Sequence, residues 1–359
     1  KEYKKFYGNN QRYCGKAGVS RGTVDRVLHD RGRVSPSKAK KIKEIAEKMG
    51  YRPNIAGKGL AARKMHLKIG FIYLDSDAAP FHRAIYEGAL AYARQELEPY
   101  GIEVIFFPIS VIVEDPTSLE QEGYLRELIG EENLHQDGWA VVGTIGAALE
   151  SMLKKQVIQK TPIVVYNMDE DFDWKLAYVG CDYTQSGRLA CGVSALLTNE
   201  CGHVCILSFD SGNIPSSVDR IDGFQREIAD RYPDIQILDT RFLSTDVEPD
   251  HFLTRAKEMF ARYEEAEVLY LVNPGDYSIC REISRIGAKH KIKIITNDLV
   301  TKDQQEMVKN GEIAVTICQE PEKQGAKPLE ILFRYLALGK MPDSPWYKTE
   351  LSVRIAQNV

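Results

Sequence analysis

Short apolar runs alternate with amphipathic stretches from about residue 68 onward, and this alternation is what most constrains the fold of the chain. Eight runs are strand candidates: 69–74, 102–108, 138–143, 162–167, 203–209, 235–243, 268–273 and 292–298. Helical periodicity is clearest over 84–98, 187–197, 220–230 and 249–263. Buried runs separated by helices are typical of parallel sheets with helices on both faces. Eight strands exceed one ordinary sheet, so we expect two similar lobes.

Length and composition indicate an ordinary globular chain. It has 359 residues, 43% of them apolar and 27% charged, which predicts two or three domains. No run approaches the ~18 apolar residues that a membrane helix needs, and the first residues do not form the apolar core of a signal peptide. Seven scattered cysteines without a Cys-x-x-Cys pair favour reduced thiols and a cytosolic protein.

The charge is unevenly distributed along the chain. Residues 1–68 contain 19 Lys and Arg against five Asp and Glu, a net charge of +14, and the remainder has a net charge of −18. A small basic module before a large acidic body indicates a nucleic-acid reader joined to another function. The alternative is a solvated basic surface with no partner. Six clustered residues favour the first interpretation: Arg31, Arg33, Lys38, Lys40, Lys41 and Lys43.

The basic module is predicted to contain two short helices. Gly18 supplies a tight turn, and Ser20 can cap a helix over 21–28. The apolar stripe of that helix is formed by Val24, Val27 and Leu28. A second helix begins at Ser35-Pro36 and ends before Gly50. Its stripe is formed by Ala39, Ile42, Ile45, Ala46 and Met49. Two such helices joined by a short loop are typical of a helix-turn-helix DNA reader.

The sequence AGVSxxTVxRVL, followed by VSP and GYRPNxxAxxLAxR, resembles the headpiece of the lac/gal repressor (LacI type) family of bacterial transcription factors over residues 17–63. The resemblance implies a helix-turn-helix headpiece over residues 1–52, with Arg21, Gly22 and Arg26 at base-reading positions. The DNA-binding residues that it implies are Ser20, Arg21, Gly22, Thr23, Arg26, Arg31, Arg33, Asn54 and Leu60. Asp25 stands where the family often has Ser, and an acid near phosphate needs an Arg or a cytosine amino group as its partner.

By the same resemblance, residues 53–66 form a hinge helix whose Leu60 would wedge into a minor-groove step. Gly57 and Gly59 each cost a helix about 1 kcal/mol relative to Ala. We therefore expect this segment to become helical only on DNA. The alternative is a plain flexible linker.

Residues 1–16 do not supply the amphipathic helix that the family needs before Ala17. Gly8 and Gly15 interrupt them, and no helical apolar period is present. With permissible codons, reading one base later from Tyr7 spells METIKDIAE, and one added adenine then restores the frame at KAGVS. We hypothesise that these residues are frameshifted. The alternative is a divergent first helix.

Polar residues follow the predicted strands of the body, residues 67–359. Ligands of open parallel sheets bind beyond the carboxyl ends of the strands. Asp75, Ser76, Phe81 and His82 follow the first run, and further polar residues follow later ones. Asp, Asn, Arg and Gln with an aromatic ring suit a polyhydroxylated ligand, because each hydroxyl needs a donor and an acceptor. For Asp75 and Ser76, surface decoration is an equal alternative.

The body resembles the two-lobed ribose-type (type I) periplasmic binding proteins, whose fold the lac/gal repressors share. The motifs that carry the resemblance are PFH (80–82), RIDGF (220–224), ND (297–298) and QEPEKQG (319–325). The effector contacts that it implies are Phe81, His82, Asn167, Arg220, Asn273, Asp298 and Gln319. Where sugar binders often have Asp-Arg, this chain has Asn167-Met168, which removes a charged pair and leaves the identity of the ligand open.

Other chemistry has weak support in the sequence. No Walker-A loop, G-x-G-x-x-G, H-E-x-x-H or G-x-S-x-G motif is present, and no catalytic residue, cofactor or metal is expected. Cys201, His203 and Cys205 would share one side of a strand but lack a fourth ligand, so buried strand positions are the better interpretation. The acids of residues 169–173 lack EF-hand spacing and are interpreted as a solvated loop.

The sequence therefore predicts a cytoplasmic, homodimeric transcriptional regulator, not an enzyme. It would bind pseudo-palindromic operator DNA under the control of a sugar or polyol. The first alternative is a solute-binding protein that does not bind DNA. A sugar- or nucleotide-modifying enzyme would need a nucleophile or an acid–base pair with supporting spacing, and none is found.

Overall fold

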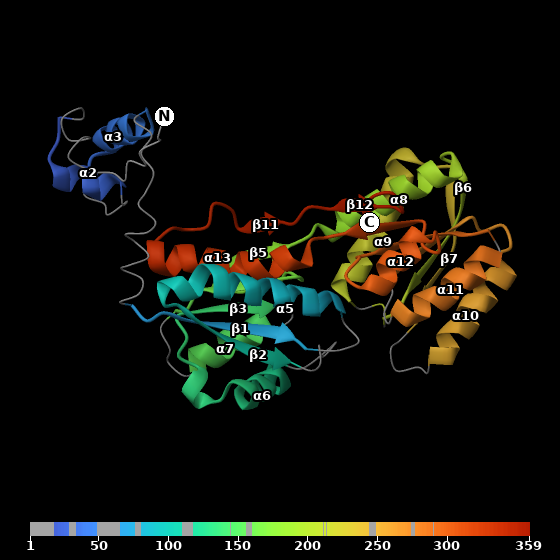
Figure 1. Cartoon of the computed structure of the whole chain (residues 1–359), viewed down its shortest axis with the longest axis horizontal. Helices are drawn as coiled ribbons and strands as arrows, with labels where there is room; N and C mark the ends of the chain where they lie inside the picture. Colours follow the sequence, from blue (N-terminus) through green and yellow to red (C-terminus); the bar gives the residue numbers. More distant parts are fainter. Residues whose placement is uncertain are drawn as a thin grey trace. The chain divides into compact units, whose positions relative to one another are not determined.

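The structure is a computed structural model of the whole chain, and it describes residues 18–28, 34–48, 65–75, 80–109, 118–143, 145–155, 160–210, 212, 214–243, 249–273, 277–289 and 291–359. Two compact units are distinguished, Lys1–Met65 and His66–Val359. Helices and strands are labelled in Figure 1.

The first unit contains the two predicted helices, α2 (Arg21–Leu28) and α3 (Pro36–Lys48). Gly18 has φ +65°, as a tight turn before α2 requires. The backbone N–H of Thr23 donates to the Ser20 hydroxyl oxygen over 3.3 Å, which is the expected cap. Val24, Val27 and Ile42 are buried together between the helices. The two-helix arrangement is therefore confirmed, whereas Met49, Gly50 and the hinge segment 53–64 lie outside the described residues.

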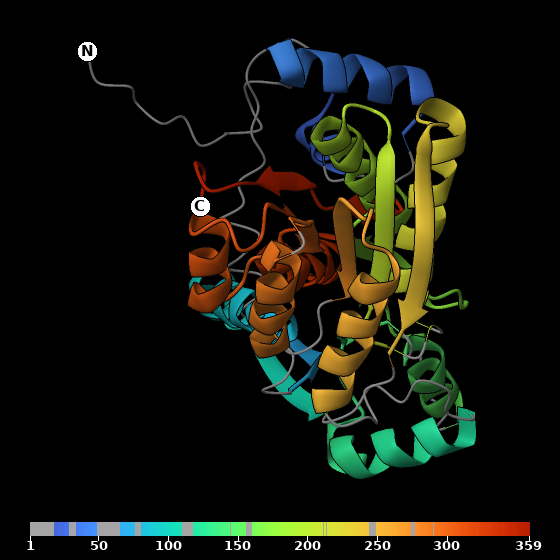
Figure 2. The same cartoon turned by 90° about the vertical axis from the view of Figure 1, so that its right-hand side faces the viewer.

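The second unit is built on two sheets, as the alternation of the sequence predicted (Figures 1 and 2). Each sheet has six strands, whereas the sequence predicted eight strands in all. Sheet 1 contains β1 (Lys68–Leu74), β2 (Glu103–Ile109), β3 (Gly138–Val142), β4 (Ile163–Tyr166), β5 (Lys175–Gly180) and β11 (Trp346–Lys348), in the order β11-β5-β4-β3-β1-β2. Sheet 2 contains β6 (Gly202–Ser208), β7 (Ile235–Phe242), β8 (Val268–Asn273), β9 (Lys293–Asn297), β10 (Val315–Cys318) and β12 (Ser352–Arg354), in the order β12-β10-β9-β8-β6-β7. Every pairing is parallel except that of β10 with β12.

Helices cover both faces of each sheet in Figure 1. Around sheet 1 lie α5 (Pro80–Tyr92), α6 (Ser118–Ile129), α7 (Gly146–Lys155) and α13 (Pro321–Leu338), which with the sheet form lobe 1. Around sheet 2 lie α8 (Tyr183–Thr198), α9 (Pro215–Arg231), α10 (Pro249–Arg262), α11 (Tyr277–Lys289) and α12 (Lys302–Lys309), which form lobe 2. Central strands such as β3 are buried throughout, as expected when both faces are covered.

The chain crosses between the lobes three times, and two of the crossings deliver a helix. After β5 of lobe 1 the chain enters α8 of lobe 2, and after β10 of lobe 2 it enters α13 of lobe 1. Each of these helices packs closely on a neighbour through a glycine. A Cβ added to Gly187 of α8 would lie 1.8 Å from the carbonyl oxygen of Arg220, and one added to Gly325 of α13 would lie 1.9 Å from that of Ile85. Neither position accepts a larger residue without movement of the backbone.

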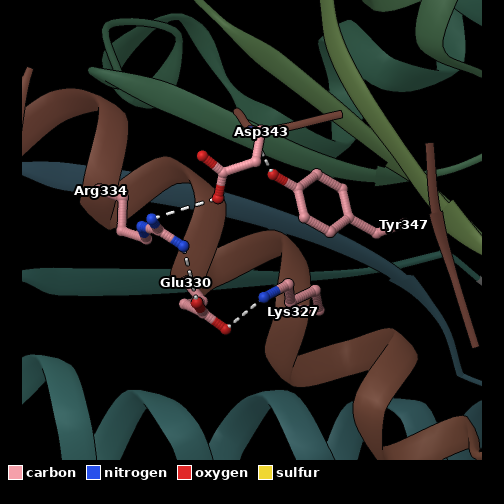
Figure 3. A network of polar contacts seen from close by, with 5 residues as sticks. All are labelled: Lys327, Glu330, Arg334, Asp343 and Tyr347. Atoms are coloured by element: carbon pink, nitrogen blue, oxygen red, sulfur yellow. Dashed lines mark hydrogen bonds and ion pairs between the residues drawn. The ribbon is translucent and has the colours of Figure 1, made fainter. Parts of the chain in front are cut away.

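The strand β11 and the residues just before it, which lead to the third crossing, between β11 and β12, are attached to α13 by a polar network (Figure 3). Glu330 accepts from Lys327 over 2.8 Å and from Arg334 over 3.5 Å, and Arg334 also contacts Asp343 over 3.4 Å. The backbone N–H of Asp343 donates to the Tyr347 hydroxyl over 2.8 Å, and the Lys327 ammonium lies 5.0 Å from the centre of the Tyr347 ring.

Neighbouring crossings also contact each other. The Lys348 ammonium of β11 lies 2.9 Å from the carboxylate of Asp182, the residue that caps α8. The backbone N–H of Glu350 donates over 2.9 Å to the carboxylate of Glu320, which precedes α13. Charged side chains thus link the third crossing to the other two, through Asp182 before α8 and Glu320 before α13.

Two sequence predictions about helices were wrong in detail. The predicted helix 84–98 is α5, which begins at Pro80, followed by a π-helical turn (Ala93–Leu97) and a 3-10 turn (Glu98–Tyr100). Pro99 has no N–H to continue the α-helical pattern, and Gly101 (φ +70°) ends the segment. Arg220, expected in a loop at the start of a helix, lies inside α9, because Pro215 starts that helix earlier.

No helix in the described part of the chain is both long enough and apolar enough to cross a membrane. Six cysteines lie in the part of the chain that the structure describes, and none of them is in a disulfide there: Cys181, Cys191, Cys201, Cys205, Cys280 and Cys318.

Candidate functional site

Most of the predicted effector residues lie at the carboxyl ends of strands or just beyond them. Asn167 follows β4, Asn273 is the last residue of β8, Asp298 follows β9, and Gln319 follows β10. Asn167 and Asp298 both have positive φ, +68° and +69°. Asn and Asp tolerate this conformation better than most residues, and it turns the chain sharply at the end of the strand.

Asp298 is a buried carboxylate that is only half satisfied. One oxygen, Oδ2, accepts from the Gln319 amide over 3.1 Å. Of the buried polar atoms that the structure describes, Oδ1 is among the few with no hydrogen-bond partner. Burial raises the pKa of Asp298 to about 6, although the Arg220 charge and the Gln319 hydrogen bond both oppose the rise. A buried acceptor left open at the end of a strand is suited to a ligand donor.

Arg220 contributes a buried cation to the same region. It is 6% exposed, and its guanidinium carbon lies 4.7 Å from the centre of the Tyr183 ring, which Arg220 faces as a cation on an aromatic surface. Its Nε is a buried donor without a partner within the described ranges. The close contact of Gly187 with the Arg220 carbonyl places Arg220 on the side of α9 that packs against α8. An open donor and the open acceptor of Asp298 are complementary to a hydroxyl group.

Asn167 and Gln319 belong to one network with Gln324 of α13. The Asn167 amide donates to Gln324 over 3.3 Å and to the Tyr183 hydroxyl over 3.2 Å. The Gln324 amide in turn donates to the backbone and side-chain oxygens of Gln319, over 3.1 and 3.3 Å. The carbonyl oxygen of Asn167 accepts from Tyr178 and Tyr183, over 2.7 and 2.8 Å. The amide of Asn167 is thus already engaged by the protein itself.

Asn273 lies in a second cluster, centred on Asp210. Asp210 is fully buried and accepts from the hydroxyls of Ser208 and Ser217 over 2.6 and 2.7 Å and from the Gly212 N–H over 2.7 Å. Asn273 donates to it over 3.5 Å. Asp210 was not predicted from the sequence, although it follows the strand β6 and so carries the same signal as the other residues at strand ends.

Phe81 and His82 start α5 in lobe 1, with ring centres 5.7 Å apart in an edge-to-face arrangement. Burial lowers the pKa of His82 to about 4, so it is a neutral imidazole at physiological pH. Asp75 is exposed after β1, and Ser76 lies outside the described residues. The structure thus joins Asn167, Asp298 and Gln319 in one network beside Arg220, and places Phe81 and His82 on a different element.

The predicted DNA-binding residues are partly described. Gly22 and Arg26 are exposed on α2, and Arg26 Nε donates to the Gly22 carbonyl over 3.1 Å. Thr23 is half-buried on the same helix, and Ser20 precedes it. Arg21 begins α2. Arg31, Arg33, Asn54 and Leu60 lie outside the described residues.

The cysteines of the possible metal site and the acids of residues 169–173 have structural positions, as the sequence interpretation favoured. Cys205 is buried in β6 while Cys201 is exposed before it, and no group of three or more His, Cys, Asp or Glu that could hold a metal ion occurs in the part of the chain that the structure describes. The acids of 169–173 contact Lys side chains, as in the 3.1 Å pair of Asp169 with Lys175. Glu170 accepts from the backbone N–H of Gly146 at the start of α7, over 2.7 Å.

Two family models match the chain. The model described as "Periplasmic binding protein domain" matches residues 69–341, and that described as "Bacterial regulatory proteins, lacI family" matches residues 15–54. Catabolite control protein A of Priestia megaterium is 47% identical over 49 residues, which cover 14% of this chain and 15% of that protein. The HTH-type transcriptional regulator AscG of Escherichia coli is 25% identical over 216 residues, 60% of this chain and 59% of AscG.

The fold is also found among solved structures. The glucose-galactose binding protein GanP of Geobacillus stearothermophilus superposes with a TM-score of 0.65 at 18% identity, covering 82% of this chain and 98% of GanP. At that identity the likeness establishes the fold alone. The matched parts of this chain span less than two thirds of the curated relatives described above.

Proposed function

The chain belongs to the periplasmic binding protein domain family over residues 69–341 and matches the lacI family of bacterial regulatory proteins over residues 15–54, and from this premise we propose that it is a DNA-binding transcriptional regulator whose operator affinity is controlled by a sugar or polyol. The observation that carries the proposal is the pair of complementary open groups in lobe 2, Asp298 Oδ1 and Arg220 Nε. They lie in the same chain as a headpiece with an exposed Arg26.

The DNA half of the proposal depends on α2 and on charge. The residues we assign to base reading are Arg21, Gly22 and Arg26, and Gly22 leaves room for a base edge beside Arg26. The other proposed DNA contacts are Ser20, Thr23, Arg31, Arg33, Asn54 and Leu60. The net charge of +14 over residues 1–68 favours phosphate binding by counterion release, so affinity should fall steeply with added salt.

The effector half depends on hydroxyl recognition. Asp298 Oδ1 is an open acceptor and Arg220 Nε an open donor, and Gln319 holds the other carboxylate oxygen of Asp298 over 3.1 Å. Phe81, His82, Asn167 and Asn273 complete the proposed set. GanP, named as a glucose-galactose binding protein, has the same fold, which supports a sugar as the ligand class. We assign no catalytic group, cofactor or metal to the protein.

We further propose that two copies bind one pseudo-palindromic operator in the cytoplasm, with one headpiece on each half-site. The sugar would alter the angle between the lobes and thereby the spacing of the two hinge segments 53–66. In this scheme residues 1–52 form the headpiece, and residues 67–359 bind the sugar and form the dimer.

Two measurements test the proposal. Thermal shifts with pentoses, hexoses, inositols and sugar phosphates identify the ligand, with Asp298→Ala as control; a ligand that stabilises both proteins equally would contradict the site. Selection from random-sequence duplexes, followed by gel shifts at several salt concentrations, tests the reader. Binding that does not distinguish any duplex from heparin would rule out operator recognition.

A solute-binding protein without DNA-binding activity is the second candidate, and the likeness to GanP is what favours it. It predicts the same sugar response with no selected duplex. The two candidates thus differ only in the DNA measurement.

A further inference from the structure

Three side-chain amides form a continuous chain of hydrogen bonds from lobe 1 to the Asp298 carboxylate in lobe 2. The Asn167 amide N–H donates to Gln324 Oε1 over 3.3 Å, and Gln324 Nε2 donates to Gln319 Oε1 over 3.3 Å. Gln319 Nε2 then donates to Asp298 Oδ2 over 3.1 Å. Each amide accepts from the preceding one and donates to the next, so the chain has a single direction that ends on the carboxylate.

Both ends of this chain determine how the amides are oriented. At one end the carbonyl of Asn167 is bound by two tyrosine hydroxyls, which hold its backbone in place. At the other end Asp298 can only accept when ionised, so Gln319 must present its NH₂ group and not its oxygen. With its NH₂ group so placed, Gln319 Oε1 points back toward Gln324, which must donate to it.

Gln324 is the central member, and its burial is what makes it informative. It is fully buried on the face of α13 that otherwise carries apolar residues such as Leu332. Its neighbour Gly325 packs against the carbonyl of Ile85, so the helix cannot move toward α5 to compensate for a lost contact. A fully buried amide on such a face is costly unless all its hydrogen bonds are used.

We infer that Gln324 is a positioning residue for the proposed effector site: by holding the Gln319 amide toward Asp298 Oδ2, it leaves Oδ1 open for the ligand and ties the arrangement of the lobes to that carboxylate. The inference rests on the proposed function for the role of Asp298. Gln324 itself needs no contact with the ligand, because it acts through Gln319.

The titration of Asp298 reports on this arrangement. The titratable groups that face it are Arg220 of α9, Tyr183 of α8, Tyr270 of β8, Cys318 of β10, and Cys181 between β5 and α8. Burial raises the pKa of both thiols to about 12 and raises that of both phenols above its usual value. Between pH 4 and 8, only Asp298 of this set changes charge.

The experiment compares Gln324→Met with Gln304→Met in the full chain, using NMR of isotope-labelled aspartate and Asp298→Asn to assign the signal. Gln304 is a matched control, since its side chain is only 1% exposed in α12 and its Oε1 accepts from the backbone N–H groups of Val300 and Thr301. Without Gln324 the Gln319 amide is free to rotate away, so the ionised form of Asp298 loses a hydrogen bond. We expect its titration midpoint to rise by on the order of one pH unit, the equivalent of one hydrogen bond to a charged group.

Gln304→Met should leave the midpoint unchanged. An unchanged midpoint in Gln324→Met would overturn the inference, because Gln324 would then have no effect on Asp298. An equal shift in Gln304→Met would also overturn it, because the shift would then be a general effect of replacing a buried amide. Gln324→Asn, which keeps the amide but shortens its reach, gives the same test if the Met variant does not fold. The measurement uses neither sugar nor DNA, so its failure is distinguishable from failure of the proposed function.

Discussion

Asp298 and Asp210 are two buried carboxylates of lobe 2 that differ in how many hydrogen bonds they accept. Asp210 accepts from two hydroxyls and a backbone N–H, whereas Asp298 has one oxygen without a partner among the described residues. A charged group that is incompletely bonded inside a protein costs stability, and such groups gather where ligands bind. The difference between the two residues leads to opposite effects of the same substitution.

We expect Asp298→Asn to stabilise the ligand-free protein near pH 7. The folded pKa of about 6 lies above the unfolded value near 4, so the folded state binds the proton more tightly, and stability falls as the pH rises from about 4 through 6. Asn has no charge to bury, so the gain at pH 7 should be up to about 3 kcal/mol and should vanish near pH 4. Denaturant unfolding at several pH values measures it.

Asp210→Asn is the matched control and should destabilise the protein, because its amide presents donors to groups that already donate. Identical pH profiles for Asp298→Asn and the unchanged chain would show that Asp298 carries no such penalty.

Strand-end residues were the part of the candidate site that sequence analysis could predict. Asn167, Asp298 and Gln319 follow apolar runs, and a parallel sheet brings such positions to one edge. Tyr183 and Gln324 were missed because they reach the site from helices, through packing that the local sequence does not encode. Arg220 was selected through its motif, while its actual position within α9 depends on where that helix starts.

Among the elements, α8 provides an internal comparison between two glycines. A Cβ at Gly187 would collide with the Arg220 carbonyl, whereas one at Gly192 would meet no atom within 4 Å. We expect Gly187→Ala to destabilise the protein by about 1–3 kcal/mol and to weaken sugar binding, because Arg220 must move. Gly192→Ala should stabilise it by about 0.5–1 kcal/mol, since Ala favours the helix. Chemical unfolding of both variants checks this, and equal effects would contradict the close packing of α8 on α9.

The segment before α2 leads to a second prediction at this scale. If residues 1–16 are frameshifted, a chain beginning METIKDIAEKAGVS should bind selected duplexes more tightly than the chain as it stands, because an amphipathic helix would brace α2. Gel shifts of the two chains at one salt concentration measure the difference. Equal affinity would favour a divergent first helix, and resequencing of the locus provides an independent check.

Most strands of the body were predictable to within a residue or two, whereas β5, β10, β11 and β12 were not. The strands β11 and β12 have three residues each and are not fully buried, so they carry no apolar run of their own. They become strands because the third crossing places them beside β5 and β10. Pairing of this kind depends on the whole fold and not on local preference.

For the whole molecule, regulation by a sugar requires that the two binding events be coupled in both directions. If the sugar weakens operator binding tenfold, the operator must weaken sugar binding tenfold, a coupling free energy of about 1.4 kcal/mol. Calorimetric titration of the sugar with and without the selected duplex tests this equality. A sugar that binds both forms equally cannot be the regulatory ligand.

The crossings that place α8 in lobe 2 and α13 in lobe 1 affect how the protein can fold during its synthesis. Sheet 1 is covered by α13 and bordered by β11, and both come from residues after 320. Leu329 and Leu332 of α13 are part of the buried core of lobe 1. During synthesis, part of the apolar surface of lobe 1 therefore stays uncovered until α13 and β11 have left the ribosome. A nascent chain stalled before residue 320 should remain a client of chaperones.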